Sequence, residues 1–189
     1  MKLVKLAAIA ATVTVLQGCV AAAVVGVVGG ASVASDKRTV GAQIDDQKIE
    51  LDAYAKLAEH EGISDNTNLQ ITAMNGSVLI VGQAPNSYLR DEAMKIVKAV
   101  PGVEQIHNQI RLGNSVSIGT KSNDVWLTSK VKTALFGSDN LDATNIKVVT
   151  ENGEVFLMGL VTRDEAQEAV DIARNVGGVN RVIKAFEYL

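Results

Sequence analysis

The chain has a single cysteine, two histidines and fewer basic than acidic residues, and each shortage argues against a class of function. With only Cys19, no internal disulfide and no cysteine-cluster metal site can form. His60 and His107 fall on different predicted elements, and we interpret both as surface residues. The formal charge is -3, and loss of Lys2 and Lys5 with a leader would make it more negative. This balance argues against a nucleic-acid binder, because such proteins are broadly basic.

The sequence also lacks the usual signatures of an active site. No GxGxxG or GxxxxGK motif opens a predicted helix, and no Ser/His/Asp arrangement or metal-ligand spacing is present. Glu92 and Glu168 occupy matched positions in the chain, but they lie on predicted helix faces beside other charges, as solvated surface residues do. We therefore predict a protein that is not an enzyme and that uses no cofactor and no metal.

The N-terminus contains a short apolar stretch, residues 6–16, between two lysines and Cys19. It is shorter than the roughly 20 residues that a spanning helix needs. Gly18 supplies the small residue that a signal peptidase requires at the cleaved bond. The sequence Leu16-Gln17-Gly18-Cys19 resembles the cleavage box of bacterial lipoproteins. It predicts a signal peptide over 1–18, an acylated Cys19, and a lipidated tether over 19–44.

A membrane span that is never cleaved is the alternative for this region. Apolar character resumes after Cys19, so that residues 6–34 could be one segment. The second half is rich in glycine and alanine and only weakly hydrophobic, which favours the lipoprotein interpretation. In bacterial lipoproteins, an Asp directly after the cysteine retains the protein in the inner membrane. Val20 stands there, so this resemblance implies the outer membrane.

Downstream of the tether, one unit occurs twice. Residues 69–82, LQITAMNGSVLIVG, and 146–159, IKVVTENGEVFLMG, both place Asn-Gly between apolar-rich runs and both end in Gly. Asn-Gly in this setting predicts a two-residue β-hairpin turn, because both turn residues need positive φ. The predicted turn and strand-end residues are Asn75, Gly76, Gly82, Asn152, Gly153 and Gly159.

Each matched segment continues into a helix and a third strand. Apolar residues recur at helical spacing over 93–100 and over 169–176, and a glycine near the end of each run suits a helix stop. Residues 103–112 and 179–188 predict closing strands. Each hairpin is also preceded by a helix candidate, at about 46–61 in the first unit and 123–136 in the second.

The predicted fold class is therefore α+β, with two tandem αββαβ domains. A right-handed β-α-β crossover places the third strand parallel to the second and puts both helices on one face of a small three-stranded mixed sheet. A domain of this size is marginally stable alone, so packing of the two units together is expected to help. The predicted boundaries are 45–112 for the first domain, 113–121 for a linker, and 122–189 for the second domain.

The order α-β-β-α-β, the Asn-Gly hairpin, the Gly after the second strand and the closing helix-Gly-Val-strand resemble the BON domain. Two copies behind a lipoprotein cleavage box resemble the dual BON-domain outer-membrane lipoproteins over nearly the whole chain. The likeness is strongest at residues 19–26 and 150–161, TENGEVFLMGLV. The opening helix of the first domain matches less obviously.

This resemblance implies a lipid-anchored protein on the inner leaflet of the outer membrane, facing the periplasm and enriched at the division site. It implies support of the membrane barrier and binding of anionic phospholipid by the first helix of the second domain. It further implies, as partners, the β-barrel assembly machinery or regulators of cell-wall amidases. Proteins of this family are not enzymes.

The two opening helices differ in charge. Residues 45–61 contain six carboxylates and two lysines, a net charge of -4, whereas residues 121–136 contain three lysines and one aspartate, a net charge of +2. An anionic lipid surface would repel the first helix and attract the second.

On a helical wheel, the core side of the second opening helix collects Leu127, Val131 and Leu135. Aromatic and apolar residues outside this cluster lie beside lysines, as in helices that bind at a membrane interface. Serine and threonine hydroxyls on that side can hydrogen-bond headgroup oxygens. The candidate phospholipid-binding residues are Gly119, Val125, Trp126, Ser129, Lys130, Lys132, Thr133 and Phe136.

The alternative is that these apolar residues are covered by protein: Trp126 by the first domain, and Val125 and Phe136 by the linker or a loop. Two functions stay open at this point. One is a phospholipid-binding module, and the other is a periplasmic scaffold that binds proteins through its acidic first helix. Both can hold together, one for each domain.

Overall fold

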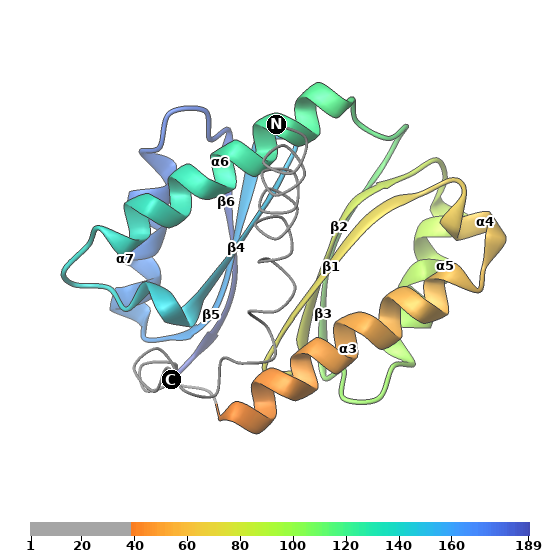
Figure 1. Cartoon of the computed structure of the whole chain (residues 1–189), viewed down its shortest axis with the longest axis horizontal. Helices are drawn as coiled ribbons and strands as arrows, with labels where there is room; N and C mark the ends of the chain where they lie inside the picture. Colours follow the sequence, from red (N-terminus) through yellow and green to blue (C-terminus); the bar gives the residue numbers. More distant parts are fainter. Residues whose placement is uncertain (1–38) are drawn as a thin grey trace, which may run out of the picture. The chain divides into compact units, whose positions relative to one another are not determined.

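The computed structural model describes residues 39–189, which belong to one compact unit (Figure 1). The predicted signal peptide, Cys19, most of the predicted tether and the alternative membrane span lie outside these residues. Among the helices of the described part, none has the length and apolar character that crossing a bilayer requires.

The first domain contains a three-stranded sheet with its longer helices on one face. In chain order its elements are α3 (Val40–Ala58), α4 (Glu61–Ser64), β1 (Asn68–Met74), β2 (Ser77–Ala84), α5 (Ser87–Lys98) and β3 (Gln105–Leu112). The strand order is β1-β2-β3, with β1 antiparallel and β3 parallel to β2. Figure 1 shows α3 and α5 covering the same face of this sheet.

The second domain repeats this arrangement with α6 (Ile118–Phe136), a 3-10 turn η2 (Ala143–Asn145), β4 (Ile146–Glu151), β5 (Glu154–Val161), α7 (Arg163–Arg174) and β6 (Arg181–Tyr188). Its strand order is β4-β5-β6, again antiparallel and then parallel. The predicted αββαβ fold class is confirmed. The short helix α4 and the turn η2 were not predicted.

Each hairpin turns at its Asn-Gly pair. The φ angles are 52° and 74° at Asn75 and Gly76, and 51° and 74° at Asn152 and Gly153. Two consecutive positive φ values give the turn a twist that matches the strands on either side. This geometry fixes the register of both hairpins.

Gly82 and Gly159 are neither turn residues nor the last residues of their strands, which corrects the sequence prediction. They lie inside β2 and β5, where the backbone of Asn68 in β1 and of Asn145, directly before β4, comes close. A Cβ atom at Gly82 would lie 1.9 Å from the Asn68 carbonyl oxygen, and one at Gly159 would lie 2.6 Å from the Asn145 carbonyl oxygen. Glycine is needed here because the strands approach too closely for a side chain.

Both opening helices begin earlier than predicted, so the helix α3 extends into the predicted tether and α6 into the predicted linker. The Thr39 hydroxyl accepts a hydrogen bond from the Ala42 N–H at 3.1 Å, and the Ser117 hydroxyl accepts one from the Thr120 N–H at 3.2 Å. An N-cap of this kind stabilises a helix start by about 1 kcal/mol. The linker without helix or strand is therefore limited to residues 113–117.

Each sheet is buried on both faces. One face packs under the domain's own helices, with the Ile49, Val78 and Ile80 side chains in the first domain. On the other face, Met74 and Leu79 of the first domain share a cluster with Phe156 and Met158 of the second. The shared cluster supplies the mutual packing expected for two small domains.

Candidate lipid-binding face

The apolar residues predicted to lie outside the core of α6 are exposed. Trp126 is 60% exposed, Val125 69% and Phe136 64%. The alternative in which the first domain, the linker or a loop covers them is therefore wrong. On the opposite side of the helix, Leu127 and Val131 are buried.

Ile118, which the sequence did not predict as part of this surface, is 85% exposed and belongs to the same side of α6. At 100° per residue, Ile118, Val125 and Phe136 have nearly the same direction from the helix axis. They form an apolar stripe along the whole helix, and we call this stripe with Trp126 the outer face of α6. Ile118 was missed because the predicted helix began after it; the Ser117 N-cap was the signal that could have extended the helix.

The Trp126 ring is held in place by Lys130. The Lys130 ammonium lies 4.3 Å from the centre of the ring and donates a hydrogen bond of 2.5 Å to the Gly177 carbonyl oxygen. A cation over an aromatic face contributes about 0.5–1 kcal/mol at an exposed site. Lys130 therefore positions the indole. Because its ammonium already contacts the Trp126 ring and the Gly177 carbonyl, it is less available to a lipid phosphate than the sequence predicted.

The other two lysines of α6 lie on the opposite flank of the outer face. The Lys121 ammonium donates a hydrogen bond of 2.7 Å to the Asn68 side-chain oxygen. Lys132 is exposed, and within residues 39–189 its ammonium makes no hydrogen bond or ion pair. Lys132 is therefore the lysine of this helix that is most available to an external anion.

Ser129 and Thr133 do not have free hydroxyl hydrogens, which corrects their predicted role. The Ser129 hydroxyl donates to the Val125 carbonyl at 3.1 Å, and the Thr133 hydroxyl donates to the Ser129 carbonyl at 2.9 Å. Their oxygens can accept hydrogen bonds from a headgroup but have no hydrogen left for a phosphate. Gly119 lies exposed in the first turn, and a Cβ there would lie 3.7 Å from the Ser117 hydroxyl, an ordinary contact distance.

Asp124 is buried, so it does not oppose the lysines on the outer face. Its carboxylate accepts hydrogen bonds from the N–H groups of Asn152, at 2.7 Å, and Gly153, at 2.8 Å. In the first domain, Asp46 of α3 does the same for Asn75, at 2.9 Å, and Gly76, at 3.1 Å. Each opening helix is thus attached to the hairpin turn of its own domain, a link that sequence analysis missed.

The outer side of α3 has a different character. Ile44 and Leu51 are exposed there, and they are flanked by Asp45 and by the ion pair of Lys48 with Asp52, whose atoms are 2.8 Å apart. This ion pair raises the pKa of Lys48, first through the hydrogen bond to Asp52. The surface is apolar and acidic, and the lysine between Ile44 and Leu51, Lys48, is paired with Asp52.

Three residues interpreted as surface residues are half-buried instead. His107 lies 3.1 Å from the Ser77 hydroxyl, and burial lowers its pKa. Glu92 pairs with Lys95, and Glu168 accepts a hydrogen bond from Ser138. Within residues 39–189, no three metal-ligating side chains come together.

Comparison with known proteins identifies the repeated unit. A family model described as the BON domain matches residues 45–114 and again residues 123–189. The chain is 41% identical over 185 residues to outer membrane lipoprotein DolP of Haemophilus influenzae, which covers 98% of this chain and 96% of that protein. It is 38% identical over 154 residues to the 21 kDa hemolysin of Actinobacillus pleuropneumoniae, covering 82% and 79% of the two chains. Osmotically-inducible protein Y of Escherichia coli is 28% identical over 156 residues, covering 81% and 77%.

Proposed function

The chain belongs to the BON-domain family, and we propose that it is an outer-membrane lipoprotein whose second domain binds anionic phospholipid through the outer face of α6. The placement in the outer membrane rests on the likeness to the Haemophilus influenzae lipoprotein and on the cleavage box at Cys19. The proposed role is binding, in support of outer-membrane integrity, and includes no catalysis.

The exposure of Trp126 beside Lys130 is the observation that carries this proposal. Tryptophan favours the headgroup level of a bilayer, and a lysine stem can lie along the apolar layer while its ammonium reaches phosphates. Each lysine near an anionic surface contributes about 1 kcal/mol. The stripe of Ile118, Val125 and Phe136 would enter the acyl boundary, with Lys132 at its side.

In this proposal the acyl chains on Cys19 supply attachment, and α6 adds a second signal that depends on lipid composition. A helix that prefers anionic lipid concentrates its protein wherever such lipid is enriched. Enrichment at the division site would follow from this preference, and it belongs to the proposal.

The test uses Trp126 as its reporter, because it is the only tryptophan of the chain. The protein from residue 20 onward is titrated with vesicles of phosphatidylglycerol and, separately, of phosphatidylcholine. We expect a blue shift of the emission with the anionic vesicles alone, and a weaker shift at high salt because screening reduces the attraction.

A matched pair of variants separates α6 from the rest of the protein. Val125→Glu places a charge in the outer face of α6, and Leu51→Glu places the same charge on the exposed side of α3. Val125→Glu should abolish the shift, and Leu51→Glu should retain it. Equal behaviour of the two variants, or an unshifted parent, would contradict the proposal.

A protein-interaction scaffold is the second candidate function, and the exposed Ile44 and Leu51 on α3 favour it. Apolar side chains that remain exposed on a helix are typical of a protein interface. The proposed partners are the β-barrel assembly machinery or regulators of cell-wall amidases. Photo-crosslinking from Leu51 in cells should give a discrete protein adduct, and recovery of lipid alone would count against this function.

A further inference from the structure

The two sheets have equivalent edge strands, β1 and β4, whose outward-facing backbone groups follow from the hairpin registers. In a hairpin with a two-residue turn, the pair next to the turn is hydrogen-bonded, and hydrogen-bonded pairs then alternate along the strands. Met74 pairs with Ser77, and Glu151 pairs with Glu154, next to the two turns. The N–H groups of Ile71 and Ala73 in β1, and of Val148 and Thr150 in β4, therefore point away from their sheets.

The edge of β1 is closed by side chains from α3 and by one from β4. The Ala73 N–H donates to the Glu50 carboxylate at 2.8 Å, and the Ile71 N–H donates to the Tyr54 hydroxyl at 2.8 Å. The Ala73 carbonyl accepts a hydrogen bond of 2.6 Å from the Lys147 ammonium. Another strand could not pair with β1 here without breaking these bonds.

The edge of β4 lacks this closure. Glu50 and Tyr54 lie about one and two turns after Asp46 in α3, and Thr128 and Lys132 occupy the same places after Asp124 in α6. The Thr128 hydroxyl donates its hydrogen bond to the Thr150 hydroxyl, at 2.8 Å, and not to the backbone of β4. Within residues 39–189, the Val148 and Thr150 N–H groups have no hydrogen-bond acceptor.

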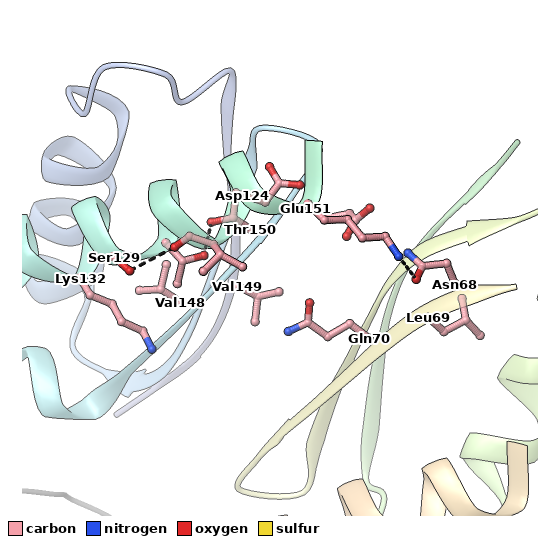
Figure 2. Close-up of a pocket in the computed structure, with 13 residues that line it drawn as sticks. Asn68, Leu69, Gln70, Asp124, Ser129, Lys132, Val148, Val149, Thr150 and Glu151 are labelled. Atoms are coloured by element: carbon pink, nitrogen blue, oxygen red, sulfur yellow. Dashed lines mark hydrogen bonds between the residues drawn. The ribbon is translucent and has the colours of Figure 1, made fainter. Parts of the chain in front are cut away.

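A groove runs along this open edge. A hollow of about 430 Å³ has Lys132 of α6 with Val148 and Thr150 of β4 on one side, and Asn68, Leu69 and Gln70 of β1 on the other (Figure 2). Thr128 of α6 also lines it. A second hollow, of about 130 Å³, lies near Ile146 and shares Lys132 and Val148 with the first. The two hollows follow β4, which at about 3.4 Å per residue is long enough to pair with a segment of five or six residues.

We propose that the edge of β4 binds an extended acidic peptide segment of another protein as an additional strand. Unpaired N–H and C=O groups at a sheet edge are the template for this kind of binding. This inference goes beyond the proposed lipid function, because it uses the backbone of β4 and Thr128; Lys132 belongs to both proposals.

The preference for an acidic segment rests on one side chain of the groove, Lys132. Both Asp124 oxygens accept hydrogen bonds from the turn, and the Glu151 carboxylate accepts one from Gln83. Lys121 is hydrogen-bonded to Asn68. All these partners are uncharged, so the two lysines and two carboxylates that line the hollow balance in formal charge. Within residues 39–189, the Lys132 ammonium makes no hydrogen bond or ion pair, and it would face a carboxylate of the incoming strand.

The experiment uses the full chain in nanodiscs and the blocked hexapeptide Thr-Val-Glu-Val-Thr-Val as its probe. Binding is followed by fluorescence anisotropy of the labelled peptide, and backbone pairing by hydrogen–deuterium exchange over residues 146–151. We expect saturable binding, at least tenfold slower exchange in this segment, and at least threefold weaker binding when lysine replaces the peptide's glutamate. A backbone N-methylated peptide should not bind, because it cannot donate to the edge.

Two variants of α6 make the test specific. Thr128→Glu places a carboxylate where Glu50 closes the edge of β1, and it should weaken binding at least tenfold. Ser122→Glu adds the same charge on the exposed side of the same helix, away from the groove, and should leave binding within about twofold.

Several results would overturn the proposal: absence of binding, binding without protection of residues 146–151, or equal weakening by Ser122→Glu and Thr128→Glu. Protection that grows with protein concentration alone would assign the edge to a second copy of the chain. Protection by phosphatidylglycerol without peptide would assign it to lipid. Failure here leaves the fluorescence test of the outer face of α6 unaffected, because that test requires no peptide.

Discussion

The helices α3 and α6 perform the same structural task in two copies of one fold, yet the charges around their exposed apolar residues have opposite sign. Each uses a buried aspartate, Asp46 or Asp124, to bind the turn of its own hairpin. Outside, α6 presents Trp126 and lysines, whereas α3 presents leucine and isoleucine among carboxylates. The comparison separates what the fold requires from what distinguishes the two domains.

Residues at equal distances in sequence from Asp46 and Asp124 show which features the two domains share and which they do not. Ile49 and Leu57 of α3 are buried, and their counterparts in α6, Leu127 and Leu135, are buried as well. The residues one turn after the aspartates differ, because Glu50 closes a sheet edge and Thr128 leaves one open. A duplicated domain can therefore change its outer side and its sheet edge while its core contacts keep the same pattern.

The matched glycines of β2 and β5 allow the sharpest test of how equivalent the two domains are. Gly82 has a φ of 121°, which an L side chain rarely adopts, and a Cβ there would lie 1.9 Å from a carbonyl oxygen; at Gly159 the same distance is 2.6 Å. We expect Gly82→Ala to lower the free energy of unfolding by about 3 kcal/mol or more and Gly159→Ala by about 1–2 kcal/mol. Equilibrium denaturation measures both, and equal losses would show that the two strand contacts are equivalent after all.

The buried aspartates should have similar, somewhat smaller effects. Asp46→Ala and Asp124→Ala each remove the acceptor for two backbone N–H groups, and hydrogen bonds to a charged group contribute about 1.5–3 kcal/mol. We expect a loss of about 2–3 kcal/mol in each case, with faster hydrogen exchange in the hairpin of the altered domain. The exposed Asp45 provides the control, because Asp45→Ala should change stability by no more than about 0.5 kcal/mol. If only one of the two substitutions lowered the free energy of unfolding, the two aspartates would not have equivalent roles in their domains.

Repetition in the sequence explains why the fold was predictable and parts of the site were not. Asn75-Gly76 and Asn152-Gly153 need no tertiary contact to indicate a hairpin, and each copy supports the interpretation of the other. Helical periodicity also needs no tertiary contact, and it placed Trp126 outside the core.

Features that depend on individual side-chain hydrogen bonds, whether distant or local in sequence, were missed. Counting charges treated Asp124 as a surface residue, because its partners in the turn follow it only after an intervening segment of chain. The roles of Ser129 and Thr133 depend on local backbone geometry, which lets their hydroxyls bond within the helix. The closed edge of β1 and the open edge of β4 follow from side-chain reach, which the hydrophobic pattern does not contain.

The smallest expected effect is a pH dependence of the unfolding free energy that originates at His107. It should be present in the first domain and absent at the matched position of the second. It pairs with Leu79 across β2 and β3, at the place where Ile183 pairs with Phe156 in the second domain. Burial lowers the His107 pKa from its ordinary value of 6.5. The unfolded chain therefore takes up a proton at higher pH than the folded chain does.

The sign of the resulting effect follows by linkage: stability contributed by the neutral His107 is complete above about pH 6.5 and decreases as the pH falls toward the folded-state pKa. We expect unfolding free energies measured across this range to slope for the parent and to slope less for His107→Gln, which keeps a hydrogen-bonding group near Ser77. His60→Gln controls for the loss of a histidine, since His60 is exposed. Hydrogen exchange should place the acid sensitivity in β3 and leave β6, with Ile183 at the matched position, unchanged; an equal response of both strands would show that the acid effect does not originate at His107.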